Sequence, residues 1–501
     1  MASVDDYIRQ VIQGGDEMSA VLEKIFSSTL KNSPYVEILS EGMNSLKVIR
    51  PPRDSYITVC SRGGDPTLLE SHSYAFSVVE RLIEATESIG AAPLAFANVI
   101  DASTSDKCAI LPYAEALAEA ANKYRLVVPN GEFAVLGSRV TVPANVSATM
   151  LGILPRSSLT ARLPPIAEAP CFFEFNNIMY AVFDPQGKAL YLNSDGVGTK
   201  TEFYERINRP EKALFDSRAM KCDDLIKLGA TVQVIADVSE TNDDARTYRR
   251  GSGFQGGYKG LLSMPFHNES DIYITQHEAV ERRIRSYKEG VFAFNLSGSA
   301  VSTIDEERLN NPLKPSVGEY LVAIRGRPNP RSNGITDKRS TMVQLFGNDW
   351  HNTPIGKIFL DYLAEPSTVF YGAFKALIDT DLATSVYHMS GGAFKGKLAR
   401  PLAKHGLFAS LENLFPPDWR ELTLSGARFT NAETAYAKWP MGNEGFVSTA
   451  RPEETRAALT QYGLESRVVD QLQSAHDGIT GIKLKDIRAS DGNDVYFSGK
   501  D

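Results

Sequence analysis

The same short pattern occurs twice in this chain, 139 positions apart. Residues 89–98 and residues 228–237 each pass through a glycine and an alanine into an apolar run typical of a β-strand. The spacing holds from Gly90 to Gly229 and from Asn98 to Asp237. A repeat at this distance predicts a duplicated unit of domain size. A chance likeness between two helix–glycine–strand junctions is the alternative interpretation of so short a match.

The residues around the repeat predict an alternation of helices and strands. For the first copy we expect a helix from Asp16, a strand at 56–60, a helix at 74–87, a strand at 94–100, a helix from Pro112 to Lys123, a strand at 126–128 and an extended pair over 141–154. After a linker rich in Pro and Ser at 155–170, we expect a strand at 189–192, a helix at 213–228 and a strand at 231–236 that ends at Asp237. Beyond a boundary near 312–318, we expect a strand at 320–324 and helices at 366–378, 452–462 and 466–476, with Gly463 at a helix C-cap. This order predicts an α/β (α+β) fold.

Composition and charge narrow the class of protein. The chain has 501 residues, of which 43% are hydrophobic. No apolar run approaches the roughly 20 residues of a membrane span, and the first residues do not resemble a signal peptide, so we expect a cytoplasmic protein with no membrane partner. The net charge of -8 and the lack of a long Lys/Arg run argue against a nucleic-acid partner but allow a small anionic ligand. The four cysteines form no CxxC pair, which suits a reducing compartment and argues against structural zinc.

A glycine-containing loop directly follows the strand expected at 189–192. Its sequence is Asp195-Gly196-Val197-Gly198-Thr199-Lys200. Two glycines let the backbone approach a polyphosphate, the lysine supplies positive charge, and the aspartate is a candidate magnesium ligand. The loop matches neither GxxxxGK[ST] nor GxGxxG. An ordinary β-turn is the alternative for the Gly-Val-Gly sequence taken alone.

Further acidic residues follow this loop. Asp223 and Asp224 lie on an expected helix, and Asp237 follows the next strand. Ligands of α/β sheets bind at the carboxyl ends of strands, so Asp195, Asp224 and Asp237 are predicted to share a magnesium ion. For the adjacent pair alone, a solvated helix face is the simpler interpretation.

These motifs together resemble the aminoimidazole ribonucleotide synthetase family, the phosphoribosylformylglycinamidine cyclo-ligases. The resemblance extends over roughly 180–450 and keeps the family's order of motifs. It rests on the Asp-Gly-Val-Gly-Thr-Lys loop, on Asp223-Asp224 followed by Gly229-Ala230 and Asp237, on Ser332-Asn333-Gly334, on Tyr387-His388-Met389-Ser390-Gly391-Gly392-Ala393-Phe394 and on Trp439-Pro440-Met441-Gly442.

The resemblance implies two A-type domains and one B-type domain. Residues 1–165 would form a degenerate A-type domain, 166–315 an intact one that binds ATP and magnesium, and 316–501 the C-terminal B-type domain. The first copy has Cys60-Ser61-Arg62-Gly63-Gly64-Asp65 in place of the loop, Glu84-Ala85 in place of the acidic pair and Asn98 in place of the aspartate. Family members pair A domains between subunits, so we expect an internal pseudo-dimer, a monomer in solution and a single nucleotide site. Glu132, in Asn130-Gly131-Glu132, is a candidate to complete that site from the first copy; a surface turn residue is the alternative.

The resemblance also implies a reaction and roles for single residues. ATP would phosphorylate the amide oxygen of formylglycinamidine ribonucleotide, a phosphorylated small molecule, and an internal nitrogen would close the imidazole ring, a step of purine biosynthesis. Residues 195–200 and Asn333 would bind the cofactor, with Lys200 also catalytic. Gly391 and Gly392 would bind phosphate at a helix start, and His388 would act as an acid, a base or a phosphate ligand.

Departures from the family pattern keep other functions open. Asp223 replaces Asn, Ala393 replaces Gly, and Pro440 interrupts its motif. One alternative is a superfamily enzyme that acts on a different amide, carbamoyl, selenide or phosphate substrate, and another is a nucleotide-binding regulator without turnover. The glycine-rich insertion at 246–257 would either fold over an anionic substrate or form a solvated loop.

Overall fold

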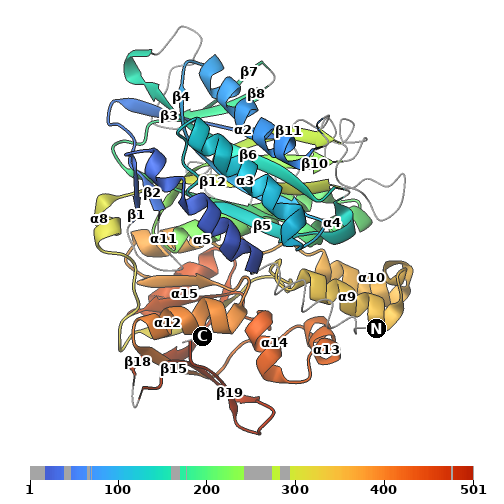
Figure 1. The fold of residues 1–501 in the computed structure, drawn as a ribbon. Coiled ribbons are helices and arrows are strands. Elements are labelled where there is room, and N and C mark those ends of the chain that lie inside the picture. Colours follow the sequence, from blue (N-terminus) through green and yellow to red (C-terminus); the bar gives the residue numbers. More distant parts are fainter. Residues whose placement is uncertain are drawn as a thin grey trace. The chain divides into compact units, whose positions relative to one another are not determined.

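The computed structural model describes residues 17–38, 47–64, 68, 70–140, 142–158, 170–176, 178–241, 273–281, 294–475 and 478–499. Helices and sheets are mixed throughout, as the α/β prediction requires (Figure 1). The chain divides into two compact units. Among the described residues, the first unit holds those up to 201 together with 230–241, 273–281 and 294–310, and the second holds 202–229 and everything from 311 onward.

The first unit contains two six-stranded sheets, and four successive strands of each, β3 to β6 and β9 to β12, are arranged in the same order. One sheet has the order β5-β4-β6-β3-β8-β7, and the other has the order β11-β10-β12-β9-β2-β1. In both, the edge strand (β5 or β11) is parallel to its neighbour and the next two pairings are antiparallel. The first sheet is built from β3 (Ser55–Gly63), β4 (Ala92–Ala102), β5 (Gly131–Val135), β6 (Ala144–Pro155), β7 (Cys171–Phe175) and β8 (Ile178–Phe183). The second is built from β1 (Val36–Ile38), β2 (Lys47–Ile49), β9 (Ala189–Gly196), β10 (Thr231–Thr241), β11 (Tyr273–Glu281) and β12 (Phe294–Ile304).

The repeat extends to the register of individual residues. The β4–β6 ladder shifts register between Pro93 and Ala95, and the β10–β12 ladder shifts at the corresponding place, between Val232 and Val234. A bulge re-aims the residues that follow it, so a shared bulge keeps the downstream side chains on matching faces. The sequence repeat is therefore a repeat of structure, and chance likeness does not explain it.

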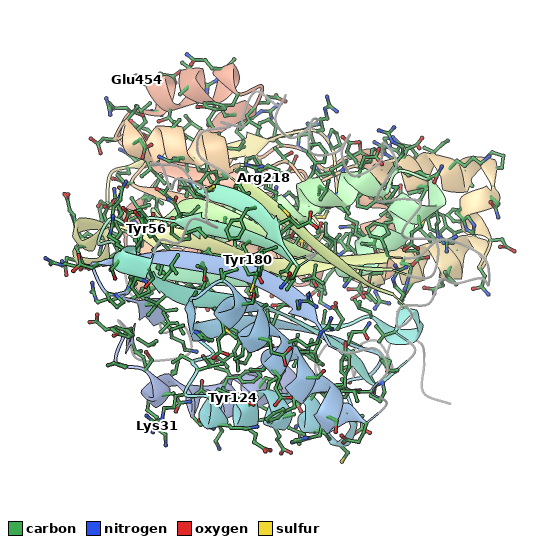
Figure 2. The ribbon with its side chains drawn as sticks, turned by 90° about the horizontal axis from the view of Figure 1, so that it is seen from above. Lys31, Tyr56, Tyr124, Tyr180, Arg218 and Glu454 are labelled. Carbon is green, nitrogen blue, oxygen red and sulfur yellow. The ribbon has the colours of Figure 1, made fainter. Side chains whose placement is uncertain are left out.

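Two apolar layers hold the first unit together. One lies between the first sheet and the helices that cover it, namely residues 17–27, α2 (Ser71–Ser88) and α3 (Lys107–Lys123). The other lies between the two sheets and includes Val59 and Leu192. Strand side chains alternate between faces, so along β4 Phe96 joins the helix-side layer while Ala95 and Ala97 join the layer between sheets. Figure 2 labels Tyr180 on β8, whose hydroxyl donates to the backbone oxygen of Ala85 on α2 at 2.9 Å.

The second unit combines two four-stranded sheets with helices. Their strand orders are β14-β16-β13-β17 and β18-β15-β19-β20. The strands are β13 (Tyr320–Arg325), β14 (Ser385–His388), β15 (Leu407–Leu411), β16 (Gly445–Thr449), β17 (Glu465–Gln471), β18 (Gln473–Ser474), β19 (Gly481–Arg488) and β20 (Asp494–Phe497). The longer helices are α5 (Ala213–Ile226), α9 (Ile335–Phe346), α10 (Pro354–Leu363), α11 (Tyr371–Asp379), α13 (Trp419–Arg428) and α15 (Pro452–Gln461).

The expected helix at 466–476 is wrong. This segment forms β17 and β18, and β17 pairs along β13. Its apolar residues are few, so local periodicity carries little signal and pairing with a buried neighbouring strand decides the conformation. By contrast, Gly463 adopts φ +72 directly after α15, as its C-cap role requires.

Several expected boundaries also shift. Pro112 lies inside α3, which begins earlier, at Lys107. Residues 126–128 form only an isolated bridge at Val127, and one strand, β6 (Ala144–Pro155), lies where a pair was expected. Asp237 does not end its strand, because β10 continues to Thr241 along both neighbours.

The two compact units do not test the three predicted domains, because one compact unit can contain both copies of a repeat. The three domains therefore stay a prediction. The division after residue 310 lies close to the boundary expected near 312–318. Helix α5, which follows the loop of the second copy in sequence, is counted with the second unit. Most of the expected linker and the insertion at 246–257 lie outside the described residues. Among the described helices, none combines the length and apolar character of a membrane span.

Candidate functional site

Two carboxylates of the predicted site flank one glycine in the second sheet. Asp195 on β9 and Asp237 on β10 both pair with Gly298 of β12. Residues in register across neighbouring strands point to the same face, so both side chains rise from one face at the same level. Gly298 has φ +140, and a Cβ there would lie 2.1 Å from the backbone oxygen of Ala236. The surface between the two carboxylates therefore consists of the backbone of Gly298, without a side chain.

The loop that follows Asp195 turns sharply into a helix. The backbone N–H of Gly196 donates to Asp195 Oδ1 at 2.7 Å, and Val197 donates to the oxygen of Leu296 at 2.9 Å. Gly198 adopts φ +61, a conformation that favours glycine. A short 3-10 helix, η4 (Gly198–Lys200), leads into α4 (Thr201–Arg206), and Lys200 is fully buried. Gly198 therefore forms the turn after which Lys200 enters the protein interior.

A segment of the first copy, from Asn130 to Arg139, lies along this loop. Asn130 Oδ1, just before β5, accepts the backbone N–H of Ser194 at 3.0 Å. Further along, Leu136 lies 3.5 Å from where a Cβ on Gly198 would be. The segment that contains the candidate Glu132 therefore runs beside the loop of the second copy.

Arg139, at the end of this segment, is buried. Its Nη2 donates to Thr201 Oγ1 at 2.9 Å and to the backbone oxygen of Phe294 at 2.8 Å. Thr201 Oγ1 in turn donates to the oxygen of Gly198 at 2.8 Å. One arginine of the first copy thus fixes the end of the loop in the second copy.

A third carboxylate lies nearby and was missed in the sequence. Asp101, on β4, accepts a hydrogen bond from Asn295 Nδ2 at 2.5 Å, and its Oδ1 lies 3.9 Å from where a Cβ on Gly196 would be. Burial, reinforced by the charge of Asp195, raises the pKa of Asp101 to about 7. The sequence gives little indication of a role for Asp101, because this residue follows an apolar run in the copy that lacks the other predicted site residues.

In the first sheet, the matching positions hold different residues. Arg62 and Asn98 both pair with Ala148, as Asp195 and Asp237 pair with Gly298. The first copy therefore lacks both carboxylates and the surface without a side chain between them. Arg62 and Asn98 thus stand in the places of Asp195 and Asp237, whose roles as ligands stay predictions.

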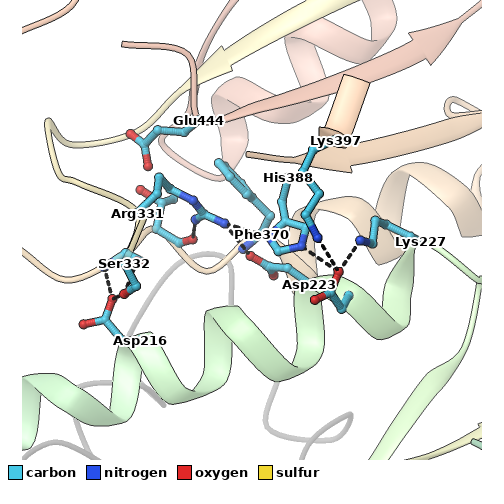
Figure 3. Close-up of polar contacts among 12 residues, drawn as sticks. Asp216, Asp223, Lys227, Arg331, Ser332, Phe370, His388, Lys397 and Glu444 are labelled. Atoms are coloured by element: carbon cyan, nitrogen blue, oxygen red, sulfur yellow. Dashed lines mark hydrogen bonds and ion pairs between the residues drawn. The ribbon is translucent and has the colours of Figure 1, made fainter. Parts of the chain in front are cut away.

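The second unit contains a buried cluster of charged residues (Figure 3). Arg331 Nη2 donates to Asp223 Oδ2 at 3.2 Å and to His388 Nδ1 at 3.1 Å. His388 Nε2 lies 2.9 Å from Asp224 Oδ1. Since Arg331 donates to Nδ1, the imidazole proton belongs on Nε2, where it is donated to Asp224. Burial lowers the pKa of His388 to about 3, so the ring is neutral at physiological pH.

Two lysines share Asp224 with this histidine. Lys227 forms an ion pair with Asp224 Oδ1, and Lys397 Nζ lies 3.9 Å from the same oxygen. Although burial alone would raise the pKa of Asp224, these cations and His388 hold it well below its ordinary value. The pKa of Asp223 shifts in the opposite direction. Burial raises it to about 7, because the effect of burial outweighs the opposing effect of the Arg331 charge.

The loop before α9 carries this arginine in a strained conformation. Arg331 and Ser332 adopt φ +54 and +50. Ser332 Oγ donates to Asp216 Oδ1 on α5 at 2.7 Å, and Arg331 lies over the Phe370 ring at 4.7 Å. Positive φ in residues other than glycine costs about 1–3 kcal/mol each and persists only where surrounding contacts hold it. These contacts tie the loop to α5.

Asn333 links this loop to the predicted phosphate-binding glycines. Its Nδ2 donates to the backbone oxygen of Ser390 at 2.9 Å, directly before Gly391 and Gly392. As expected, a helical stretch follows these glycines, a π-helix labelled η8 (Phe394–Ala399) that leads into α12 (Arg400–Lys404). Ala393, where the family pattern has glycine, adopts φ +38.

Comparison with known proteins finds distant sequence relatives of this chain. No protein-family model matches the chain. It is 26% identical over 229 residues to the phosphoribosylformylglycinamidine cyclo-ligase of Pyrococcus horikoshii, which covers 45% of this chain and 63% of that protein. It is 24% identical over 203 residues to the enzyme of the same name from Thermococcus kodakarensis, covering 40% of this chain and 56% of that protein. The chain is thus similar, over less than half of its length, to enzymes of the aminoimidazole ribonucleotide synthetase family.

Solved structures give weaker likenesses. Thiamine-monophosphate kinase from Stenotrophomonas maltophilia K279a matches with a TM-score of 0.38 and 12% identity, covering 61% of this chain and 90% of that chain. Phosphoribosylformylglycinamidine synthase II from Thermotoga maritima matches with a TM-score of 0.34 and 9% identity, covering 64% of this chain and 44% of that chain. With TM-scores this low, neither likeness bears on the function of this chain.

The predicted site residues of this chain fall into two groups. Asp195, Asp237, Lys200 and Glu132 belong to the first unit, whereas Asp224, Asn333, His388, Gly391 and Gly392 belong to the second. Within the described residues, no group of three or more His, Cys, Asp or Glu side chains is placed to hold a metal ion. The magnesium role of Asp224, and the ligand roles of the other residues, stay predictions.

Proposed function

We propose that this protein is an ATP-dependent enzyme that activates an amide oxygen by phosphorylation. The proposed substrate is formylglycinamidine ribonucleotide and the proposed product aminoimidazole ribonucleotide. The observation that carries the proposal is the pairing of Asp195 and Asp237 with the same glycine, Gly298, at the start of the loop that ends in Lys200. The sequence relationship to two cyclo-ligases supports the same activity, although the chain spans less than two thirds of either relative.

The two carboxylates suit the magnesium ion that the family implies. Mg²⁺ in nucleotide sites takes one or two carboxylates, with waters and substrate phosphates as its other ligands. Asp195 and Asp237 would supply the carboxylates, since they share a face of the sheet with no side chain between them. When bound, the ion would neutralise phosphate charge and orient the γ-phosphoryl group.

The chain's own groups would then position the transfer. Lys200 and the backbone around Gly196 and Gly198 would hold the phosphates, a task of positioning and electrostatics. The amide oxygen attacks the γ-phosphorus and ADP leaves. The internal nitrogen then attacks the activated carbon, its proton is lost to solvent, and inorganic phosphate leaves as the ring closes.

His388 fits a positioning role in this scheme. A neutral ring that accepts from Arg331 and donates to Asp224 has both nitrogens occupied. It would hold Asp224 and the strained loop in place instead of exchanging a proton with the substrate. This is a narrower role than the acid, base or phosphate ligand that the family motif implies.

Internal pairing of the two A-type copies is part of the proposal. Ser147 and Ser297 occupy matching positions in β6 and β12, and their hydroxyls share a hydrogen bond of 3.1 Å. A contact between equivalent residues is what a pseudo-two-fold axis produces. The carboxylates and loop occur in the second copy only, so we propose one nucleotide site per monomeric chain.

A second candidate is another amide substrate of the superfamily. It is favoured by Asp223, which stands where the family has Asn and pairs with the buried Arg331. An acidic residue in place of an amide changes the chemistry of this cluster and gives a basis for a changed substrate.

The experiment is ADP release from magnesium-ATP with and without formylglycinamidine ribonucleotide. The proposal expects substrate-dependent ADP and aminoimidazole ribonucleotide from the wild type, and neither from Asp195→Asn. Arg62→Ala, at the matching position of the first copy, is the control and should retain activity. ADP release that depends only on a different amide would favour the second candidate, and nucleotide binding without any ADP would favour a regulator.

A further inference from the structure

Two partly exposed lysines meet at one carboxylate oxygen in the second unit. Lys227 directly follows α5, and Lys397 lies in η8. Lys227 forms an ion pair with Asp224 Oδ1, and Lys397 Nζ lies 3.9 Å from the same oxygen (Figure 3). Two ammonium groups from distant parts of the sequence are therefore held close together.

The lysine side of this cluster is open to solvent, unlike the rest of it. The side chains of Asp224, Lys227 and Lys397 are 27%, 25% and 28% exposed. Those of Asp223 and Arg331 are only 0% and 2% exposed. A ligand from solution can therefore reach both ammonium groups without displacing the buried part of the cluster.

One carboxylate does not balance two lysines. Asp224 supplies a single negative charge to them, and the neutral ring of His388 adds none. The neighbouring Asp223 is engaged by Arg331 at 3.2 Å. A distance of 3.9 Å is too long for a hydrogen bond, so Lys397 does not use its donors on the Asp224 oxygen. The site thus combines surplus positive charge with hydrogen-bond donors that face solvent, as an anion requires.

The same contacts make Asp224 a poor ligand for magnesium. Its Oδ1 accepts from both Lys227 and His388, and an oxygen has two lone-pair sites. A divalent cation on Oδ2 would lie beside two ammonium groups that repel it. A phosphate monoester fits better, because it carries a charge of about −1.5 to −2 at pH 7 and has three strong acceptor oxygens.

We propose that Lys227 and Lys397 bind the phosphate group of the substrate, a phosphate monoester. Each ammonium group donates to a different phosphate oxygen, and Asp224 holds the two lysines together when the site is empty. His388 keeps the carboxylate in place from the buried side. The inference rests on the proposed function only in that the proposed substrate carries such a phosphate, and it gives Asp224 a role that needs no metal ion.

Calorimetric titration of the full chain with ribose 5-phosphate, without nucleotide or magnesium, tests this site. Lys227→Gln and Lys397→Gln each remove one charge-assisted hydrogen bond, so each should weaken binding by about 10- to 100-fold. Lys375→Gln is the matched control and should bind as the wild type does, because Lys375 lies on α11 of the same unit and pairs with Asp379 at 2.5 Å. Wild-type affinity in both lysine variants, or no binding of millimolar ribose 5-phosphate by the wild type, would overturn the inference.

Asp224→Asn separates an anion site from a metal site. Asparagine keeps an acceptor for His388 but removes the charge that competes for the lysines, so affinity for ribose 5-phosphate should stay the same or rise. Weaker binding in this variant, or binding by the wild type that requires magnesium, would contradict the inference.

A second ligand identifies the source of the phosphate. Lys397→Gln should bind a magnesium-bound, non-hydrolysable ATP analogue as tightly as the wild type does. A loss of affinity for this analogue and not for ribose 5-phosphate would assign the lysine to the nucleotide and overturn the inference, while ADP release could still support the enzyme. Lysine-dependent binding of ribose 5-phosphate without any ADP release would instead support this site and count against the proposed function. Should Lys227→Gln not fold, Lys397→Gln alone carries the test.

Discussion

A methyl group on Gly298 tests the close approach of strands beneath the two carboxylates. In Gly298→Ala the new Cβ would lie 2.1 Å from the backbone oxygen of Ala236 and 2.9 Å from Asp237 Cα. Neither atom belongs to a flexible side chain, so β10 and β12 must separate. The variant should therefore lose both stability and the spacing of Asp195 and Asp237.

The magnitude follows from two costs. Alanine at φ +140 costs about 1–3 kcal/mol in backbone strain, and an overpacked site costs about 1–3 kcal/mol more. Together they predict a loss of about 2–6 kcal/mol in the free energy of unfolding. Gly187→Ala is the matched control in the same unit, because Gly187 has φ +75 but open space around it. It should lose only about 1–2 kcal/mol.

Urea unfolding of both variants measures this difference, with the slope m as a check that the unfolding transition is unchanged. Binding of the magnesium-bound ATP analogue, measured under native conditions, should weaken in Gly298→Ala and not in Gly187→Ala. Equal losses of stability in the two variants would refute the close approach of β10 to Gly298. Ala148, at the matching position of the first sheet, already carries a methyl group, so the constraint is specific to the second copy.

Three further predictions concern other parts of the chain. Ala393→Val should lose about 3 kcal/mol of stability in thermal unfolding, because a β-branched residue tolerates φ +38 poorly, while Ala393→Gly should stay within about 1 kcal/mol of the wild type. Arg139→Met should lose about 2–3 kcal/mol, since it leaves the oxygens of Thr201 and Phe294 without a charged donor, and Arg139→Lys should recover part of the loss. The pKa of His388 is lowered by burial to about 3, so the unfolded chain alone takes up this proton as pH falls below about 6.5, and the wild type loses stability on acidification. His388→Asn should reduce that loss by up to about 1.4 kcal/mol per pH unit between pH 6.5 and 5 in urea titrations, and an unchanged pH profile would contradict a neutral buried ring.

The repeat could be predicted from sequence because it is written in local patterns. Gly90 and Gly229 mark turns with φ +79 and +72, and the apolar runs after them become β4 and β10. Turn glycines and strand alternation depend on neighbouring residues, so a linear sequence contains them. The pairing of Asp195 with Asp237 through Gly298 required strand register, which the sequence does not state.

The residues missed in the sequence depend on contacts between distant segments. Asp101 and Arg139 come from a copy whose own loop is replaced, and only the packing of the two sheets shows that they lie beside Gly196 and Thr201. The strand β17 was mistaken for a helix for the same reason, since its pairing with β13 overrides a weak local preference. The motifs can be recognised in the sequence, but long-range strand pairing decides which of their residues lie close together.

The most direct test of the account is the number of nucleotides that one chain binds. Calorimetric titration with a non-hydrolysable ATP analogue and magnesium should give one nucleotide per chain. Asp195→Asn should abolish this binding, whereas Arg62→Ala should leave it intact. Two nucleotides per chain, or one that survives Asp195→Asn with unchanged affinity, would contradict a single site built on the carboxylates of the second copy.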